Sequence, residues 1–316
     1  MSSQKQHNEA YPTGVTISLK ELMRYEYYVQ DMPILPQHPV YSLLAGRHAS
    51  KLRGRGLDFE EVRVYVPGDD VRNIDWRVTA RTGITHSKVF NEEKERPGFI
   101  IVDQTSFLFF GSKMYTKSVI AAQAAALSAF YIVKRGDRVG GIVFNDATHQ
   151  YISPKRSKSH VQYVLQAIAD MNTLLPQRKA ITSNILPLNE ILQQARSVIT
   201  HDYVITVISD FSTINQDTKK HLRNLSQHND VMLVHISDPF DGALPNGRIV
   251  LSNGKRQITW QNNKHHWGEK YEEAYSKLLR GLSDEFRMYH IPVVQMDTTL
   301  PVEQQVMQHM GKLTKR

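Results

Sequence analysis

The segment Phe99-Ile100-Ile101-Val102-Asp103 decides the fold, because it is a short apolar run that ends in an acid. The same pattern recurs at 203–210, 231–238 and 291–297. Apolar runs of this length that do not alternate with polar residues are typical of strands buried on both faces of a sheet. Helical segments separate the runs, so we predict a mostly parallel α/β sheet with these aspartates along its C-terminal edge, where open α/β sheets bind ligands.

The order of the strands follows from what precedes the first run. A charged, glycine-punctuated segment comes before 99–102, and no earlier long apolar run exists to pair with it. We therefore expect strand 99–102 in the middle of the sheet beside strand 203–209, with Asp103 and Asp210 converging at one crevice. Asn-Asp and Asn-Gly turns predict two hairpins, at 139–152 and 248–260. Helices are expected near 19–29, 113–134, 158–172, 185–196, 215–228, 269–288 and 302–312.

Composition bounds the class of protein. The 316 residues are 41% apolar and 22% charged, which is ordinary for a globular chain. No apolar stretch is long enough to span a bilayer and the first residues lack the apolar core of a secretion signal, so we expect a cytoplasmic protein. The absence of cysteine excludes disulfides, thiolate zinc sites and a cysteine nucleophile. The formal net charge is +8, but the basic clusters are short and not interleaved with aromatic residues, which favours a solvated surface or an acidic protein partner over nucleic acid.

The chain divides into three parts by composition. Residues 1–40 are predicted to be an N-terminal extension with a short helix, because prolines follow it at 33 and 36. Residues 41–97 are dense in charge and glycine and contain alternating segments, which predicts a small β-rich element. The repeating strand and helix pattern occupies 98–316 and predicts the main α/β domain.

Two stretches carry a family resemblance: GRGLDFEEVR at 54–63 and YVPGDDVRNIDW at 65–76. They closely resemble the signature of the bacterial domain-of-unknown-function family 58, and segments 102–105, 136–140 and 208–211 fit the same family. The resemblance implies a von Willebrand factor type A-like (Rossmann-type) domain preceded by a β-rich element. It also implies that the protein acts together with a MoxR-type AAA+ ATPase, and with other von Willebrand A proteins, in the chaperone-like assembly or maturation of protein complexes.

In von Willebrand A-like domains a divalent ion occupies a metal-ion-dependent adhesion site at this sheet edge. The resemblance implies Asp103, Thr105, Ser183 and Asp210 as ligands, and hydroxyl and water-bridged carboxylate ligands suit Mg²⁺. Phe107 stands where a second hydroxyl is expected, and it makes the loop apolar together with the residues that follow it. Such a degenerate site either binds Mg²⁺ weakly or has lost the ion and uses its apolar rim for protein contact. Alternatively, the two aspartates cap helix N-termini and have a structural role.

Charges of alternating sign fill the β-rich element. They form either a recognition surface for the ATPase or its client, or an internal ion-pair network with Trp76 and Phe59 as apolar anchors, since Arg pairs bidentately with carboxylates. The partner-binding candidates are Arg55, Asp69, Asp70, Arg72, Asp75, Trp76 and, from the sheet edge, Phe107.

The sequence therefore predicts a non-enzymatic interaction adaptor. It contains no Gly-x-x-x-x-Gly-Lys-[Ser/Thr] loop, no His-Glu-x-x-His and no Gly-x-Ser-x-Gly, and we assign no catalytic residues. The alternative is a Mg²⁺-dependent phosphoester hydrolase that uses the sheet-edge carboxylates. A third reading, a nucleic-acid binder, predicts affinity that falls steeply with salt.

Overall fold

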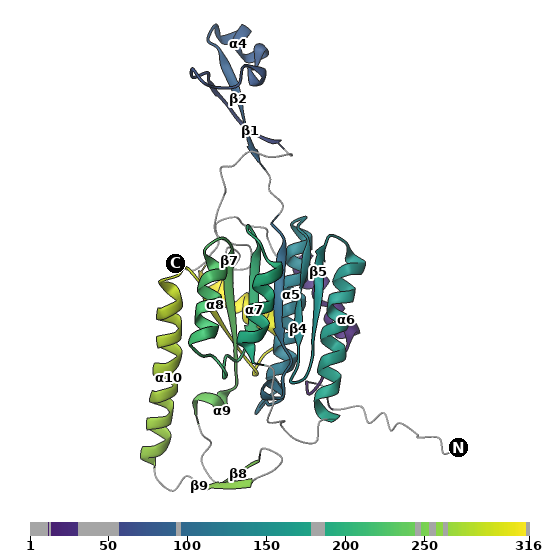
Figure 1. Cartoon of the computed structure of the whole chain (residues 1–316), viewed down its shortest axis with the longest axis vertical. Helices are drawn as coiled ribbons and strands as arrows, with labels where there is room; N and C mark the ends of the chain where they lie inside the picture. The colour runs from purple at the N-terminus through teal and green to yellow at the C-terminus, as the bar shows by residue number, and fades with distance from the viewer. Residues whose placement is uncertain are drawn as a thin grey trace, which may run out of the picture. The chain divides into compact units, whose positions relative to one another are not determined.

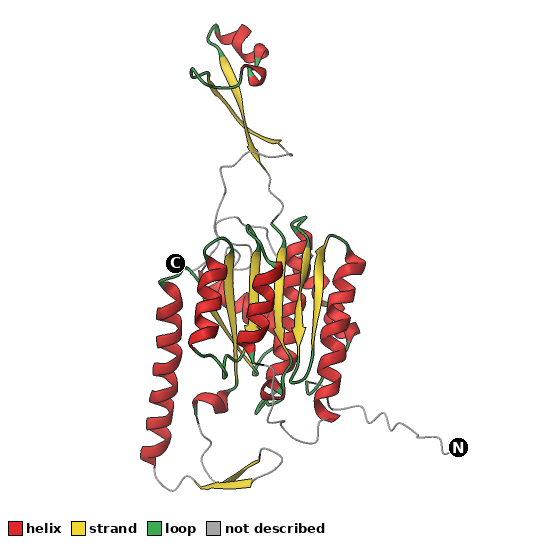
Figure 2. Ribbon diagram, in the orientation of Figure 1, coloured by secondary structure: helices red, strands yellow, loops and turns green. Residues whose placement is uncertain are grey.

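The computed structural model describes residue 12 and residues 14–30, 57–92, 96–177, 187–243, 248–252, 257–261 and 265–313. The chain forms two compact units: a small unit, Arg47–Glu95, and a sheet unit, Met1–Gly46 with Arg96–Arg316. Figures 1 and 2 show the helices and strands of each. Within the described ranges, none of the helices has the length and apolarity that a membrane span requires.

The sheet unit is built on six strands in the order β10-β7-β6-β3-β4-β5. All neighbouring strands run parallel except the edge strand β5, which pairs antiparallel with β4. The central position of β3 and its pairing with β6 confirm the order predicted from the sequence. The strands are β3 (Gly98–Asp103), β4 (Val139–Phe144), β5 (His149–Lys155), β6 (Val204–Ser209), β7 (Asp230–Ser237) and β10 (Val293–Asp297).

Strand β3 is buried along its whole length because helices cover both of its faces. Ile100 and Val102 pack into one hydrophobic cluster, whereas Phe99 and Ile101 pack into the cluster on the opposite face. This division follows from the two-residue period of a strand, which sends alternate side chains to opposite faces. A run without polar alternation is therefore what this position in the fold requires.

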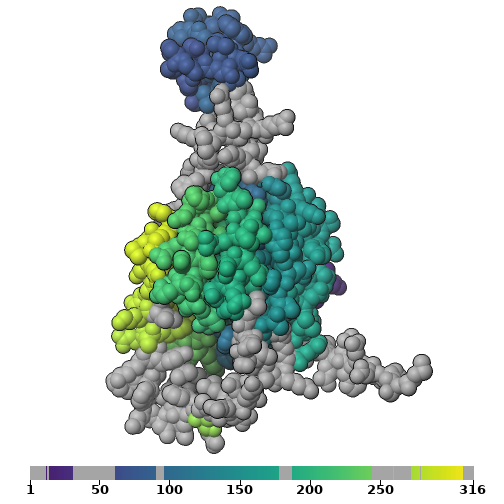
Figure 3. Space-filling model, viewed as in Figure 1, coloured from purple at the N-terminus to yellow at the C-terminus, as the bar shows by residue number. Residues whose placement is uncertain are grey.

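Helix α5 is the central element of the first face, and almost all of its residues are buried. Its alanines allow close approach to the sheet on one side and to neighbouring helices on the other. The helices on this face are α1 (Leu19–Met23), α2 (Tyr25–Gln30), α5 (Lys117–Lys134), α6 (Lys158–Leu174) and α11 (Val302–Leu313). The second face is covered by α7 (Leu188–Val198), α8 (Gln216–Ser226) and α10 (His265–Arg287), of which α7 and α8 are coloured green in Figure 3.

The N-terminal helices belong to the sheet unit, and two short helices stand where one was predicted. Ser18 and Glu21 form a capping box that starts α1. Leu22 and Val29 are fully buried in the core, and the Tyr25 hydroxyl donates to the Glu303 carboxylate at 2.7 Å. The part of 1–40 that the structure describes is thus packed against α5, α6 and α11 and completes the first face of the sheet.

The small unit pairs β1 (Leu57–Val64) with β2 (His86–Glu92) in an antiparallel ribbon. The connection between them contains the short helix η1 (Val71–Asn73) and α4 (Trp76–Thr82), which ends at Gly83 in the left-handed conformation. Among residues 61–89 only Ser87 is buried. Trp76 is 68% exposed, so the prediction that it anchors an apolar interior is wrong for this unit.

Shorter elements complete the described structure. The hairpin of β8 (Arg248–Ser252) and β9 (Gln257–Gln261) has the predicted antiparallel pairing, although its Asn-Gly turn lies outside the described residues. Short helices η2 (Ser106–Leu108), η3 (Leu175–Gln177) and α9 (Pro239–Gly242) follow β3, α6 and β7 respectively.

The close approach of β4 to its neighbours supplies a first test of the fold. A Cβ on Gly141 would stand 2.0 Å from the backbone oxygen of Ile100 in β3, so we expect Gly141→Ala to lower the free energy of unfolding. Overpacking of this kind costs about 1–3 kcal/mol, and chemical denaturation would measure it. Gly281→Ala on α10 is the matched control, since its Cβ meets nothing within 4 Å, and it should gain about 0.5–1 kcal/mol. Equal effects of the two substitutions would contradict the β3–β4 packing.

Candidate functional site

Asp103 and Asp210 end two neighbouring parallel strands, and the sheet edge brings them together as predicted. The Ser209 hydroxyl donates to Oδ2 of Asp103 at 2.7 Å, and the Thr105 backbone N–H donates to Oδ1 at 2.8 Å. Asp103 is 5% exposed. Burial, and next the negative charge of Asp210, raise the pKa of Asp103 to about 7, although its hydrogen bonds oppose the shift.

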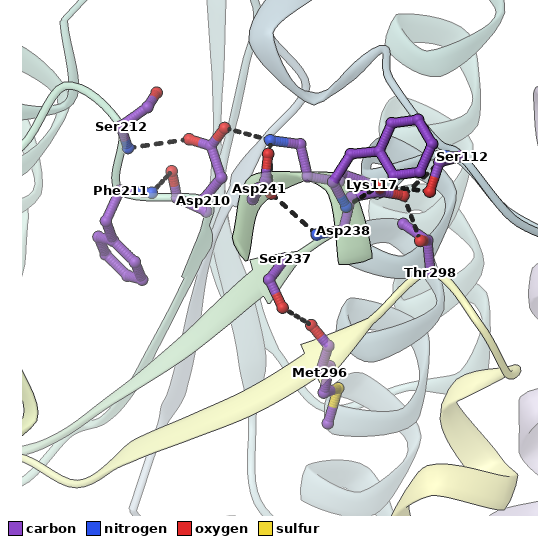
Figure 4. A network of polar contacts seen from close by, with 12 residues as sticks. Ser112, Lys117, Asp210, Phe211, Ser212, Ser237, Asp238, Asp241, Met296 and Thr298 are labelled. Carbon is purple, nitrogen blue, oxygen red and sulfur yellow. Dashed lines mark hydrogen bonds and ion pairs between the residues drawn. The ribbon is translucent and has the colours of Figure 1, made fainter. Parts of the chain in front are cut away.

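Lys117 supplies the positive charge of this site from the first turn of α5. Its Nζ donates to Asp210 Oδ2 at 2.9 Å and lies 3.4 Å from Asp241 Oδ2 (Figure 4). The side chains of Lys117 and Asp210 are each 7% exposed, whereas that of Asp241 is 27% exposed. Burial alone lowers the pKa of Lys117, but the two carboxylates outweigh it and the pKa is raised overall. Lys117 is therefore a permanent ammonium between two carboxylates.

Asp238, directly after β7, is held by hydrogen bonds. Its side chain caps α9 by accepting from the Phe240 N–H at 2.9 Å. It also accepts from both the N–H and the hydroxyl of Ser112, and from the hydroxyl of Thr298 (Figure 4). Burial raises the pKa of Asp238, but these hydrogen bonds outweigh it and lower the pKa below the usual value. Asp238 thus ties the loop before α5 to β7 and to the segment after β10.

The turn after β6 is fixed by local contacts. Asp210 Oδ1 accepts from the Ser212 N–H at 3.0 Å, and Phe211 adopts a positive φ of 52°. The Phe211 ring stacks on the buried ring of His235, with centroids 6.2 Å apart. Burial lowers the pKa of His235, so this histidine is neutral at pH 7 and adds no charge to the cluster. Since Oδ2 of Asp210 accepts from Lys117 and Oδ1 accepts from the Ser212 N–H, both oxygens of Asp210 are engaged within the chain.

The apolar loop predicted at 107–110 is exposed only in part. Phe107 is half-buried and packs against the core, and Leu108 is fully buried. Phe110 and Met114 are the exposed large apolar residues of this loop, at 42% and 59% exposure, and the Phe110 ring lies near that of Phe240. The apolar rim therefore consists of Phe110 and Met114, whereas Phe107 packs against the core.

The other predicted site residues belong to the small unit or are not described. Ser183 and Arg55 lie outside the described residues. Asp69 pairs with Arg63 at 2.7 Å and accepts from the Val66 N–H. Asp75 caps α4, accepting from the N–H groups of residues 77 and 78, and Lys88 lies 3.6 Å from it. Asp70 caps η1, and Arg72 and Trp76 are exposed.

The donor set is a poor match to the magnesium site of the resemblance. Mg²⁺ needs near-octahedral oxygen ligands at about 2.0–2.1 Å. Asp103 and Asp210 each accept hydrogen bonds on both carboxylate oxygens. The side chain of Phe107 has no oxygen that could bind a metal ion. Within the described ranges no group of three or more His, Cys, Asp or Glu side chains is arranged to hold a metal. An ion bound to Asp210 would also lie close to the Lys117 ammonium, which repels it.

Sequence reasoning missed Lys117, Ser209 and Asp241. Ser209 immediately precedes Asp210, so the strand-end pattern could have identified it. Lys117 opens an alanine-rich helix, and Asp241 sits in a short capping box after β7. A lone lysine at a helix start carries no local signal of a partner that lies 93 residues away in the sequence.

The pKa of Asp103 predicts a pH-dependent stability. An unfolded aspartate ionises near pH 4, whereas native Asp103 keeps its proton to about pH 7. Wild-type stability should therefore fall as the pH rises through this window, because the unfolded state releases the proton first. Asparagine does not titrate, so the stability of Asp103→Asn relative to wild type should rise by about 2 kcal/mol between about pH 5 and pH 8.

Urea denaturation in chelator-containing buffer would measure this difference at several pH values. Asp170→Asn, at an exposed position on α6, is the control and should show no such trend. A stability difference for Asp103→Asn that shrinks toward pH 8 would contradict the protonated state of Asp103.

Comparison with known proteins gives a family match over most of the chain. The model of the family described as "Protein of unknown function DUF58" matches residues 61–277. Uncharacterized protein Mb1516 of Mycobacterium bovis and uncharacterized protein Rv1480 of Mycobacterium tuberculosis are each 31% identical to this chain over 218 residues. The aligned region is 68% of this chain and 66% of each relative, so the chain spans just under two thirds of their length.

Solved structures with similar folds have lower identity. Conserved hypothetical protein BatB from Bacteroides thetaiotaomicron is 15% identical with a TM-score of 0.41, covering 70% of this chain and 100% of that chain. The VWA domain of SpRpn10 is 8% identical with a TM-score of 0.38, covering 68% of this chain and 95% of that domain. The strand order with its antiparallel edge strand gives the α/β, von Willebrand factor A-like fold that the sequence predicted.

Proposed function

We propose that this chain, which belongs to the DUF58 family of proteins of unknown function, is a non-enzymatic protein-interaction adaptor for a MoxR-type AAA+ ATPase. In this role it assists the chaperone-like assembly or maturation of other complexes. The surface of the small unit is the main support for an interaction role, and the resemblance noted in the sequence is the basis for naming the ATPase. A further von Willebrand A-like protein is a second proposed partner.

The small unit presents apolar side chains instead of burying them. Its exposed large apolar residues include Trp76 at 68% and four aliphatic residues: Val64, Val66, Val71 and Ile84. Large aromatic side chains on rigid elements are the residues that contribute most to protein–protein affinity, tryptophan above all. A unit with this surface and with so little buried among residues 61–89 is suited to binding another protein.

The charged residues of the small unit hold these apolar side chains in place. Asp75 caps the helix that begins at Trp76, and Asp69 joins the turn after β1 to Arg63. These pairs are exposed, so each adds little to stability. Their effect is to fix the loop conformation in advance, which lowers the entropy that an interface must lose on binding. The ion-pair network and the recognition surface are thus compatible readings of the same residues.

The sheet edge of the other unit is proposed as a second contact surface, a degenerate adhesion site. The exposed Phe110 borders the Lys117–Asp210–Asp241 cluster, since its backbone oxygen accepts from the Lys117 N–H at 2.8 Å, and the exposed Met114 belongs to the same loop. A polar cluster that is satisfied internally, next to exposed apolar side chains, has the composition of an interface centre and its polar surround.

The alternative hydrolase requires carboxylates that can bind metal ions about 4 Å apart. The oxygens of Asp210 and Asp238 instead accept hydrogen bonds from within the chain, which favours the adaptor. A phosphodiesterase assay with Mg²⁺ or Mn²⁺, repeated on Asp103→Ala, tests the alternative directly. Metal-dependent turnover that Asp103→Ala abolishes would support the hydrolase against the adaptor.

The adaptor proposal predicts a specific effect of Trp76→Ala. We expect it to weaken binding to the MoxR-type ATPase of the same cell by about 10- to 30-fold, as loss of an interface tryptophan does. The melting temperature should not change, because Trp76 is exposed. Biolayer interferometry and the ATPase rate with and without the adaptor would measure the effect.

Tyr27→Ala is the matched control, because Tyr27 is 69% exposed but lies on α2 of the sheet unit. It should leave binding unchanged. Failure of the wild-type protein to bind the ATPase or to alter its rate, together with the absence of AAA+ subunits from native pull-downs, would refute the adaptor role.

A further inference from the structure

The polar cluster at the sheet edge is built around a single positive charge. One ammonium, that of Lys117, lies between the carboxylates of Asp210 and Asp241 (Figure 4). Its side chain is 7% exposed, as is that of Asp210, so the contact is inside the protein and not a solvated surface pair. Both carboxylates contact the same ammonium, which offsets the cost of shielding their negative charges from water.

The position of that charge is set by three separate elements. Lys117 comes from the first turn of α5, Asp210 follows β6, and Asp241 lies in α9 after β7. The Thr116 side chain caps α5 by accepting from the Val119 N–H, and the Asp238 side chain caps α9. The ammonium is therefore held by fixed elements on both sides and does not depend on a loose surface side chain.

The residues around the ammonium are those expected of a site that does not need a divalent ion. Asp210 has its second oxygen on the Ser212 N–H, and Asp103 is satisfied by Ser209 and Thr105. Phe107 takes the position of a ligand hydroxyl and packs against the core. Of the groups that would bind Mg²⁺ in the related site, both aspartates are engaged within the chain and Phe107 has no oxygen to offer.

We propose that the Lys117 ammonium is the resident cation of this site, in place of a divalent metal, so that the sheet edge is ordered without added ions. The lysine is part of the chain, so its positive charge is always present, and chelators or changes in Mg²⁺ concentration do not alter the site.

The wild-type protein gives the first readout. Its melting temperature should be the same in millimolar Mg²⁺, in millimolar Mn²⁺ and in chelator, and Mn²⁺ electron paramagnetic resonance should detect no bound ion. A Mg²⁺- or Mn²⁺-dependent rise in melting temperature that disappears in Asp210→Asn would overturn the proposal, because it would place a metal on the carboxylate assigned to Lys117.

Lys117→Met provides the second readout, since it keeps much of the apolar stem and removes the charge. It should melt at a lower temperature than wild type and should recover part of the loss in millimolar Mn²⁺ or Mg²⁺, because the ion replaces the missing charge. Lys117→Arg should melt close to wild type and show no response to ions. The double variant Lys117→Met/Asp210→Asn should lose the response, because one carboxylate has been neutralised.

Lys134→Met is the matched control on the same helix. Lys134 Nζ donates to the backbone oxygens of Val29 and Gln30 at the other end of α5, so this variant should lose stability without gaining an ion response. A folded Lys117→Met that shows no ion response would overturn the proposal. If Lys117→Met does not fold, the wild-type ion titration decides alone. None of these measurements involves the ATPase, so they separate this proposal from the adaptor role.

Discussion

The need to neutralise converging carboxylates governs the C-terminal edge of the sheet. Strands β3, β6 and β7 are parallel neighbours, so the acids that follow them arrive at one edge of the sheet. Charged groups shielded from water are costly unless they are protonated, hydrogen-bonded or paired. The chain uses all three means: Asp103 has a raised pKa, Asp238 accepts from Ser112 and Thr298, and Asp210 binds Lys117. The loops, caps and helix starts at this edge are arranged around these contacts.

The fold was largely predictable because its signals are periodic and local. Non-alternating apolar runs identified the buried strands, and turn residues separated them from the helices. The central position of β3 followed from the absence of an earlier apolar run, and the convergence of Asp103 and Asp210 followed from that position. The hairpin of β4 and β5 was predicted from its Asn-Asp turn, in which Asn145 Oδ1 accepts from the N–H groups of residues 147 and 148.

The site was less predictable because its contacts join residues far apart in the sequence. Lys117 and Asp210 are adjacent only after α5 and β6 have packed on the sheet. The direction of a side chain in a loop also has no sequence signal: within one apolar run Leu108 is buried, Phe107 is half-buried and Phe110 is exposed. Trp76 shows the same limit, since an aromatic residue in a charged segment suggests an interior anchor, yet it is exposed.

A lysine in the place of an ion changes how the sheet edge can bind a partner. A divalent ion with an open coordination position attracts a partner's carboxylate directly, and its effect depends on the ion concentration. The Lys117 ammonium already lies between two carboxylates of its own chain, so the cluster has a net negative charge and little positive charge left for a ligand. In the proposed adaptor role, affinity at this edge comes from apolar contacts such as those of Phe110 and Met114, which salt screens much less than it screens exposed charge pairs. The same physical basis applies to the apolar surface of the small unit, so both candidate surfaces are suited to binding by burial of apolar area.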